Sequence, residues 1–315
     1  MCIRDRFAVT HGAENCFESY ERMLADPNLD AVIIATADAF HVPAALQALA
    51  AGKHVLCEKP LGVTLEEVEA LGRAVAESGL KLQVGHMKRF DPGLQSAREF
   101  IDSEMGDMLA FKAWYCDSTH RYAMTDAVQP LIVRSTASRR PDHDPKADLQ
   151  QYYMLAHGCH LVDTARYLCG EIIAVQARHL QRFGAYSWFV DVEFANGALG
   201  HLDLTVAVRM DWHEGFQLYG EHGSVIAKTF NPWLFRASEV DIFRESTGAS
   251  SRVLGADAHF YRRQLESFAG AVLTDRPVSG ADVADGIAAV RAMLAIGESA
   301  ATGRPVNLAS VSGAV

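Results

Sequence analysis

Short apolar runs alternate with amphipathic helical patterns along the first third of the chain, and this alternation constrains the fold more than any other feature. Continuous apolar runs cover residues 30–36, 54–58 and 80–84, the pattern of strands that are covered on both faces. Helical patterns fill the intervals at residues 43–51 and 64–78. Strands that alternate with helices form right-handed βαβ units around a parallel sheet. The first third is therefore predicted to be an α/β unit.

Beyond about residue 105 the pattern changes to longer strands joined by tight turns. The runs at residues 186–194 and 199–208 flank Asn196-Gly197, a dipeptide that favours a two-residue hairpin turn. Runs of this kind predict an antiparallel meander with one open face. We therefore expect two domains: an α/β unit over residues 1–104, and an α+β unit with an open antiparallel sheet over residues 105–315.

Charge and composition argue against several classes of partner. The 315 residues include 29 basic and 39 acidic side chains, and the formal net charge of -10 disfavours binding to a nucleic-acid backbone. No apolar run approaches the roughly 20 residues that cross a bilayer, so no membrane partner is expected. The six cysteines contain no C-x-x-C pair, which favours reduced thiols in a cytoplasmic protein.

The tripeptide Glu58-Lys59-Pro60 is the strongest functional candidate from the residues alone. It follows the run at residues 54–58, and ligands of an open α/β sheet bind outside the carboxyl ends of the strands. Pro60 fixes the backbone behind Lys59, so the lysine ammonium can point into that crevice. Lysine is also a cation whose pKa falls readily in a dry pocket. Taken alone, Glu58 and Lys59 fit an exposed ion pair equally well.

Several motifs, taken in order, resemble the Gfo/Idh/MocA oxidoreductases, which include relatives of glucose–fructose oxidoreductase and inositol dehydrogenase. The motifs are residues 30–36 with His41, Gly52-Lys53-His54-Val55, Glu58-Lys59-Pro60, residues 83–90 (QVGHMKRF) and residues 158–163 (GCHLVD). The resemblance extends from about residue 17 to about residue 308. It implies a Rossmann domain, NAD or NADP as cofactor, and hydride transfer to or from a sugar, polyol or related cyclic alcohol. It also suggests a homodimer or homotetramer.

The resemblance implies roles for individual residues. Lys59 is expected to stabilise the developing alkoxide, and His160 is expected to take the hydroxyl proton, because histidine titrates near neutral pH. Asp163 follows His160 by one helical turn and is expected to orient its ring. The residues expected to contact the cofactor are Thr36, Asp38, His41, Glu58, Lys59 and Pro60.

Substrate contacts are expected from His157, Tyr153 and Arg121. Three further candidates occupy the same polar loop as Arg121, namely His120, Arg139 and His143, since loops often carry specificity. His157 and His160 are spaced i, i+3, which suits a metal ion. Two ligands without a nearby third are weak evidence, so no metal is expected.

The chain departs from the family pattern at two places. The family histidine follows an aspartate by four residues, whereas Ala156 stands there in this chain; either His157 supplies the polar group or the substrate needs none. The chain also lacks the G-x-G-x-x-G turn that holds a pyrophosphate at a helix N-terminus.

The first six residues, MCIRDR, look like a translated sequencing adaptor. We therefore expect the natural protein to carry one more strand–turn–helix unit, so that this chain holds an incomplete Rossmann sheet with its first βα unit missing. As given, the chain is expected to bind dinucleotide weakly and to be inactive. Asp5 then carries no information on the choice between NAD and NADP.

Two other functions fit the sequence. A non-catalytic family member, acting as a binding or regulatory subunit, fits if Lys59 and His160 lie far apart in the fold. An enzyme that cleaves or epimerises a glycoside through transient oxidation fits if the reduced cofactor stays bound after purification.

Overall fold

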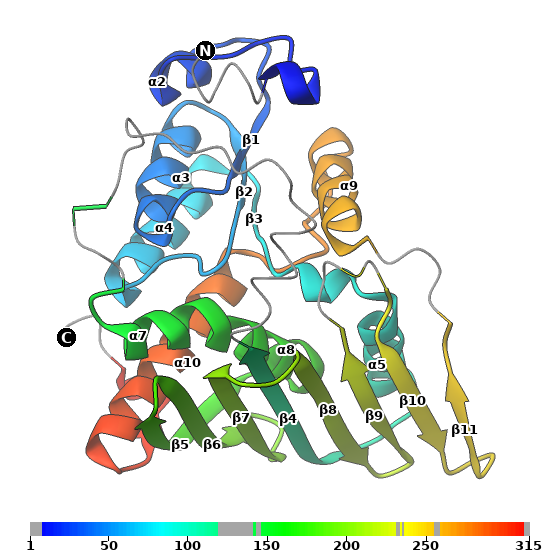
Figure 1. The fold of residues 1–315 in the computed structure, drawn as a ribbon. Coiled ribbons are helices and arrows are strands. Elements are labelled where there is room, and N and C mark those ends of the chain that lie inside the picture. Colours follow the sequence, from blue (N-terminus) through cyan, green and yellow to red (C-terminus); the bar gives the residue numbers. More distant parts are fainter. Residues whose placement is uncertain are drawn as a thin grey trace.

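The computed structural model describes residues 8–118, 141–142, 146–230, 234, 236–254 and 259–311 (Figure 1). A parallel sheet with the order β1-β2-β3 is formed by β1 (Ala31–Ile34), β2 (His54–Cys57) and β3 (Leu82–Val84). The connections between these strands contain α3 (His41–Ala50) and α4 (Leu65–Ser78). The predicted alternation of strands and helices is confirmed, and this part is a Rossmann-type layer.

Local sequence signals set the ends of these helices. The side chain of Thr64 accepts from the amide of Glu67, whose carboxylate accepts in return from the amide of Thr64, forming a capping box at α4. Gly79 ends the same helix with a left-handed φ of 66°. The side chain of Asp91 accepts from the amide of Gly93 and begins α5 (Pro92–Ser103). Shorter elements of this half are α2 (Tyr20–Leu24), η1 (Asp38–Phe40) and η2 (Met87–Phe90).

The second layer is a nine-stranded sheet with the order β11-β10-β9-β8-β4-β7-β6-β5-β12. Its strands are β4 (Met108–Ser118), β5 (Ile172–Arg182), β6 (Ala185–Phe194), β7 (Leu199–Val208), β8 (His213–Gly220), β9 (Gly223–Thr229), β10 (Glu239–Arg244), β11 (Ala249–Arg252) and β12 (Val306–Asn307). The sheet is mixed rather than wholly antiparallel as expected, because β4 runs parallel to β7 and antiparallel to β8. Helices lie in the chain between β4 and β5, and such a crossover permits parallel pairing whereas a hairpin does not.

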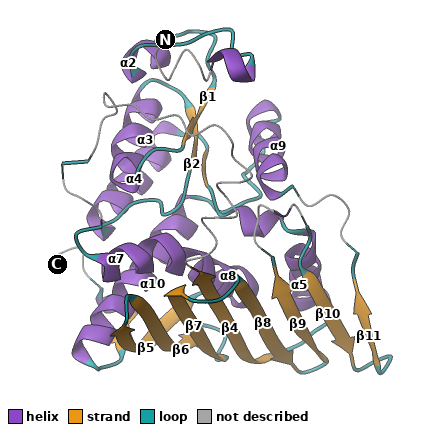
Figure 2. Cartoon of the chain, in the orientation of Figure 1, coloured by secondary structure: helices purple, strands orange, loops and turns teal. Residues whose placement is uncertain are grey.

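Helices cover one face of this sheet, and the opposite face is open (Figure 2). The helices of this half are α7 (Leu149–Tyr153), the π-helical turn η3 (Met154–Gly158), α8 (Cys159–Cys169), α9 (Phe260–Leu273), α10 (Val283–Thr302) and η5 (Leu308–Ser310). Phe189 on the open face is 52% exposed and Leu199 is 63% exposed.

The two layers share one core. A continuous cluster of buried side chains includes Val55 of β2 and Phe111 of β4. Helix α10 packs on both α4 and β5, and just before it Ala281 accepts a hydrogen bond from the amide of Val84 at 2.8 Å. A segment late in the chain therefore completes the edge of the first sheet. The division at residues 104 and 105 stays a prediction.

Candidate active site

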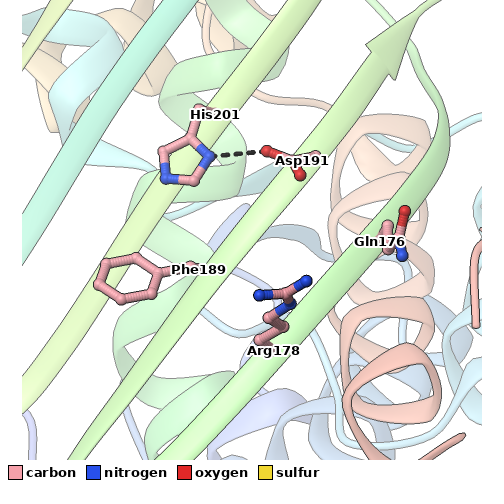
Figure 3. Close-up of a pocket in the computed structure, with 5 residues that line it drawn as sticks. All are labelled: Gln176, Arg178, Phe189, Asp191 and His201. Carbon is pink, nitrogen blue, oxygen red and sulfur yellow. Dashed lines mark hydrogen bonds and ion pairs between the residues drawn. The ribbon is translucent and has the colours of Figure 1, made fainter. Parts of the chain in front are cut away.

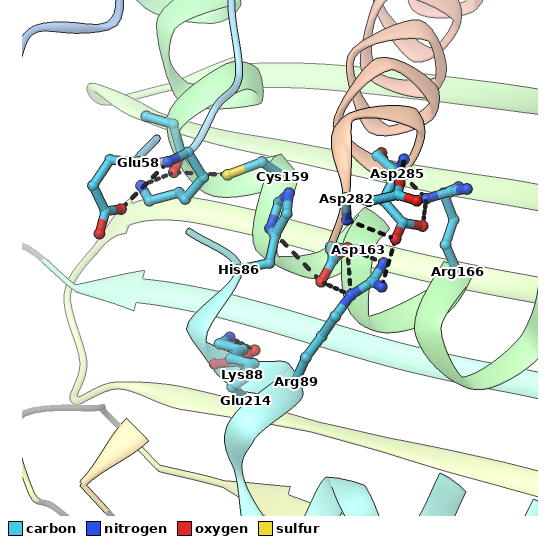
Figure 4. Close-up of polar contacts among 12 residues, drawn as sticks. Glu58, His86, Lys88, Arg89, Cys159, Asp163, Arg166, Glu214, Asp282 and Asp285 are labelled. Carbon is cyan, nitrogen blue, oxygen red and sulfur yellow. Dashed lines mark hydrogen bonds and ion pairs between the residues drawn. The ribbon is translucent and has the colours of Figure 1, made fainter. Parts of the chain in front are cut away.

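Lys59 reaches from the Rossmann layer to the helical turn that covers the large sheet. It follows β2 at the carboxyl edge of the parallel sheet, and its Nζ donates to the carbonyl oxygen of Ala156 in η3 at 3.2 Å (Figure 4). The Lys59–Pro60 peptide bond is cis. The side chain of Glu58 accepts from the amide of Lys59, and burial raises the pKa of this carboxyl group. The lysine ammonium thus lies between the carboxyl edge of the parallel sheet and η3, and we refer to this region between the two layers as the crevice.

The ring of His41 contacts the backbone of the segment that follows β2. It is 1% exposed, so the expected direct contact with a cofactor is not what the fold provides. Its Nδ1 lies 2.7 Å from the carbonyl oxygen of Pro60 and its Nε2 lies 3.2 Å from that of Thr36. His41 therefore joins the segment after β1 to the segment after β2, because both of its ring nitrogens face backbone oxygens.

His160 lies in the same crevice at the start of α8. Its ring stacks on that of Tyr115 in β4, with centroids 5.9 Å apart and an interplanar angle of 7°. Burial lowers the pKa of His160 well below its usual range, and the positive charges of Lys59 and Lys88 lower it further. The imidazole is therefore neutral near pH 7 and is able to accept a proton.

Asp163 does not contact His160 in the way expected. It is 2% exposed, and Arg89 of η2 donates to both of its oxygens, from Nε at 3.1 Å and from Nη2 at 2.7 Å. Arg89 also donates to Asp285 of α10 at 2.8 Å. The carboxylate of Asp163 is thus bound by the guanidinium of Arg89 in an ion network that joins η2, α8 and α10, rather than orienting the ring of His160 as predicted (Figure 4).

His157 and Tyr153 both lie near the crevice, as expected of substrate contacts. His157 is buried, with Nδ1 3.2 Å from the hydroxyl of Tyr115 and 3.3 Å from Oδ2 of Asp117. Tyr153 is partly buried and its ring lies 5.7 Å from that of His157. The other substrate candidates, Arg121 with His120, Arg139 and His143, fall outside the described residues.

A buried lysine, Lys88, was not assigned from the sequence. Lys88 forms an ion pair with Glu214 of β8, and its ammonium lies 4.9 Å from the centre of the Tyr115 ring. Lys88 and Arg89 belong to the stretch at residues 83–90, which is part of the family resemblance. This resemblance is the sequence signal that could have indicated a role for them. Their partners Glu214 and Asp163 lie 126 and 74 residues away, so no local pattern indicates these pairs.

Several polar side chains lie at the carboxyl edge of the parallel sheet. Thr36 is exposed just after β1, Asp38 begins η1, and Glu58 and Lys59 are partly exposed just after β2. These side chains occupy the place where an open α/β sheet binds its ligands. The glycine turn that would hold the pyrophosphate is not present in the sequence.

The hollow on the open face of the large sheet is separate from this crevice (Figure 3). It is lined by Gln176, Arg178, Phe189, Asp191 and His201. These residues alternate along their strands with the buried ones that face the helices, so the hollow opens on the far side of the sheet from His160.

Buried neutral histidines make stability depend on pH in a definite direction. Burial lowers the pKa of His86, which is 2% exposed, to about 4, so between about pH 4 and 6.5 the unfolded chain binds a proton that the folded chain does not. The free energy of unfolding therefore falls as the pH is lowered through this window, by up to about 1.4 kcal/mol per pH unit for each such histidine. Urea unfolding of the wild type and of His86→Gln at pH 6.5 and 5.0 measures this, and the variant is expected to show the smaller loss. An equal loss in both proteins would contradict it.

Two family models match the chain in succession. The model of the oxidoreductase family with an NAD-binding Rossmann fold matches residues 4–86, and the GFO/IDH/MocA C-terminal domain matches residues 94–226. The chain belongs to the Gfo/Idh/MocA oxidoreductase family. The cofactor of this Rossmann domain is accordingly NAD or NADP.

Relatives with assigned names are similar along most of the chain. An inositol 2-dehydrogenase from Rubrobacter xylanophilus is 27% identical, over 89% of this chain and 75% of the relative. A D-xylose 1-dehydrogenase (NADP(+)) from Haloferax volcanii is 27% identical, over 94% of this chain and 86% of the relative. A solved levoglucosan dehydrogenase, in complex with NADH and L-sorbose, shares the fold with a TM-score of 0.79 and 24% identity, covering 97% of this chain and 87% of that one.

Two kinds of feature, a membrane-spanning helix and a metal-binding cluster, are absent from the described residues. Within the described ranges, no helix combines the length and the apolar character needed to cross a membrane. In the same part of the chain, no group of three or more His, Cys, Asp and Glu side chains is arranged to hold a metal ion.

Proposed function

We propose that this family member is an NAD- or NADP-dependent dehydrogenase that oxidises a CH–OH group of a sugar, polyol or related cyclic alcohol. The observation that carries the proposal is that Lys59, at the carboxyl edge of the parallel sheet, reaches η3, the turn that leads into the helix of the neutral His160. The positive charge of Lys59 is among the causes that lower the pKa of His160, which supports a site formed by these two side chains.

Each residue has a definite task in such a reaction. When bound, the nicotinamide would supply the acceptor for the hydrogen of the C–H bond and its electron pair. Lys59 donates a charge-assisted hydrogen bond to the oxygen on which negative charge develops. His160, which is neutral, accepts the hydroxyl proton. Thr36, Asp38 and Glu58 would hold the cofactor at the strand ends.

The relatives support a sugar or polyol as substrate, because their names refer to inositol, D-xylose and levoglucosan. The partly exposed ring of Tyr153, whose centre lies 5.7 Å from that of His157, supports it as well. Aromatic faces of this kind pack against the apolar side of a ring, while Lys59 and His160 address its hydroxyl groups.

Two further properties belong to the same proposal. We expect the enzyme to be cytoplasmic, since Cys57, Cys116, Cys159 and Cys169 are reduced thiols. We also expect a homodimer or homotetramer that uses the open face of the nine-stranded sheet, where Phe189 and Leu199 are exposed.

The test is a panel of polyols and sugars incubated with the full-length natural protein and either NAD⁺ or NADP⁺, with reduced nicotinamide followed by its absorbance. We expect turnover of at least one polyol or sugar. The matched variant His160→Asn keeps a polar side chain of similar size and is expected to lose turnover by about 100-fold or more. A folded wild-type protein that turns over no member of the panel with either cofactor would refute the proposal.

A further inference from the structure

Lys88 and Glu214 form a buried ion pair that stability alone does not explain. Lys88 is 5% exposed and Glu214 is 4% exposed, and the Lys88 ammonium donates to Oε1 of Glu214. The other carboxylate oxygen, Oε2, is also buried and has no hydrogen-bond partner among the described residues. A buried ion pair stabilises a fold only where further hydrogen bonds satisfy its remaining polar atoms. The incomplete bonding of this pair indicates a role other than stability.

The large sheet places this ion pair against the ring of Tyr115. Tyr115 of β4 is the direct cross-strand partner of Glu214 in β8, so the two side chains lie on the same face of the sheet. The Lys88 ammonium lies 4.9 Å from the centre of the Tyr115 ring, a distance that suits a cation–π contact. Trp212 packs edge-to-face with the same ring, with centres 4.9 Å apart. These contacts fix the position of the Tyr115 ring.

His160 of α8 stacks on the ring that Lys88 contacts. The centres of the imidazole and the Tyr115 ring are 5.9 Å apart, and the two planes differ by 7°. Both side chains are buried, with 8% of His160 and 1% of Tyr115 exposed. The positive charge of Lys88 also lowers the pKa of His160, after the larger effects of burial and of Lys59. Lys88 thus acts on His160 through the ring between them and through its charge.

The charged groups of the elements around His160 fall into two sets. Four groups disfavour a proton on its ring, namely Lys59, Lys88, His86 and His157. Each nearby carboxylate has a partner of its own: Asp163 and Asp285 bind Arg89, Asp117 lies 3.3 Å from His157, and Glu214 binds Lys88. Among the described residues, no carboxylate forms an ion pair or a hydrogen bond with the ring of His160.

We propose that Lys88, held by Glu214, is a positioning residue for the proton acceptor: its ammonium fixes the Tyr115 ring on which His160 stacks, and its charge keeps the imidazole ready to accept the hydroxyl proton. The proposal rests on the proposed dehydrogenase function, in which His160 takes that proton. Lys88 itself exchanges no proton with the substrate. It holds His160 in place and in the neutral form, so that oxidation continues as the pH is lowered.

The first experiment follows the His160 side chain by ¹H–¹⁵N NMR in the full-length natural protein without cofactor, as the pH is lowered. Lys88→Met is expected to raise the pH at which His160 becomes protonated by about one unit. Because this variant leaves Glu214 buried without its cation, the double variant Lys88→Met, Glu214→Gln is measured beside it, with an expected rise of about half a unit. Lys88→Arg keeps the charge and is expected to titrate like the wild type.

The matched control is Lys53→Met. Lys53 is also a buried lysine, 9% exposed, but it precedes β2, at the opposite end of that strand from Lys59, and its Nζ donates to the carbonyl oxygen of Asp26. This variant should leave the titration of His160 unchanged. Equal titration of His160 in the wild type and in the double variant would overturn the proposal. A His160 that stays neutral in both down to the pH of unfolding would overturn it too, since Lys88 would then not be needed to keep it neutral.

The second experiment measures kcat and KM against pH for the same variants of the full-length natural protein. On the acid limb, the double variant is expected to lose about threefold in kcat/KM, the equivalent of a shift of about half a pH unit. At high pH it is expected to approach the wild type, with KM within about threefold throughout. Lys88→Arg is expected to follow the wild-type profile.

The pH profile separates this role from two others. A loss of the same size at every pH would show that the pair is merely structural, and a rise in KM alone would show that Lys88 contacts the substrate. Either result would overturn the proposal. Absence of turnover in the wild type would refute the dehydrogenase function instead, and the NMR result would still decide whether Lys88 keeps His160 neutral.

Discussion

Replacing Lys59 with alanine is expected to lower kcat for alcohol oxidation by about 100- to 1,000-fold, the usual effect of removing one preorganised donor to a developing oxyanion. The ammonium of Lys59 faces η3, where it donates a hydrogen bond to the carbonyl oxygen of Ala156. The loss of this single hydrogen bond should lower the free energy of unfolding by only about 1 kcal/mol. The activity should therefore fall far more than the stability.

Two variants make this result specific. Lys112→Ala removes an exposed lysine from β4, on the open face of the large sheet, and is expected to leave kcat unchanged. Lys59→Arg keeps the charge but changes the shape of the donor, and should retain part of the activity. Steady-state kinetics with unfolding curves for each variant provide the measurement. A Lys59→Ala enzyme with more than about half of the wild-type kcat would contradict the assigned role.

Arg89→Met is expected to lower the free energy of unfolding by about 3–5 kcal/mol, because it breaks a buried ion pair. Arg89 is 9% exposed and binds Asp163, which is 2% exposed, as well as Asp285 of α10. Without the guanidinium, Asp163 keeps a buried charge with no counter-ion at hydrogen-bond distance. Because η2, α8 and α10 meet at this network, the packing of the two layers should loosen with it.

The network gives the prediction a strong control. The double variant Arg89→Met, Asp163→Leu removes both charges and should recover a large part of the lost stability, since replacing a buried ion pair by apolar side chains is often neutral. Arg22→Ala removes an exposed i, i+4 pair with Glu18 and should change stability by less than about 0.5 kcal/mol. Chemical unfolding measures all three. A change below about 1 kcal/mol in Arg89→Met would show that the network does not hold the layers together.

The sequence was sufficient for features that depend on local patterns. The apolar runs at residues 30–36, 54–58 and 80–84 predicted the parallel strands, and all three form the sheet. The position of Lys59 after β2 followed from the rule that ligands bind at the carboxyl ends of parallel strands. The neutral state of His160 needed the structure, since it depends on burial and on two lysines that are distant in sequence.

What the sequence did not predict depends on contacts between distant residues. Asp163 was assigned to His160 because the two lie one helical turn apart, but Arg89 binds it from 74 residues away. Asp117 received no role, since nothing near it in the sequence places it beside His157. The parallel pairing of β4 with β7 was missed for the same reason, because strand order beyond adjacent hairpins leaves no local pattern.

The most direct test of the central claim is a fluorescence titration of the full-length natural protein with NADH and with NADPH, run beside its Lys59→Ala variant. The account predicts saturable enhancement with at least one of the two cofactors, and weaker or altered enhancement in the variant, because Lys59 lies where the nicotinamide is expected. No binding of either cofactor by the folded wild-type protein would contradict the account of a nicotinamide-dependent site at the edge of the parallel sheet.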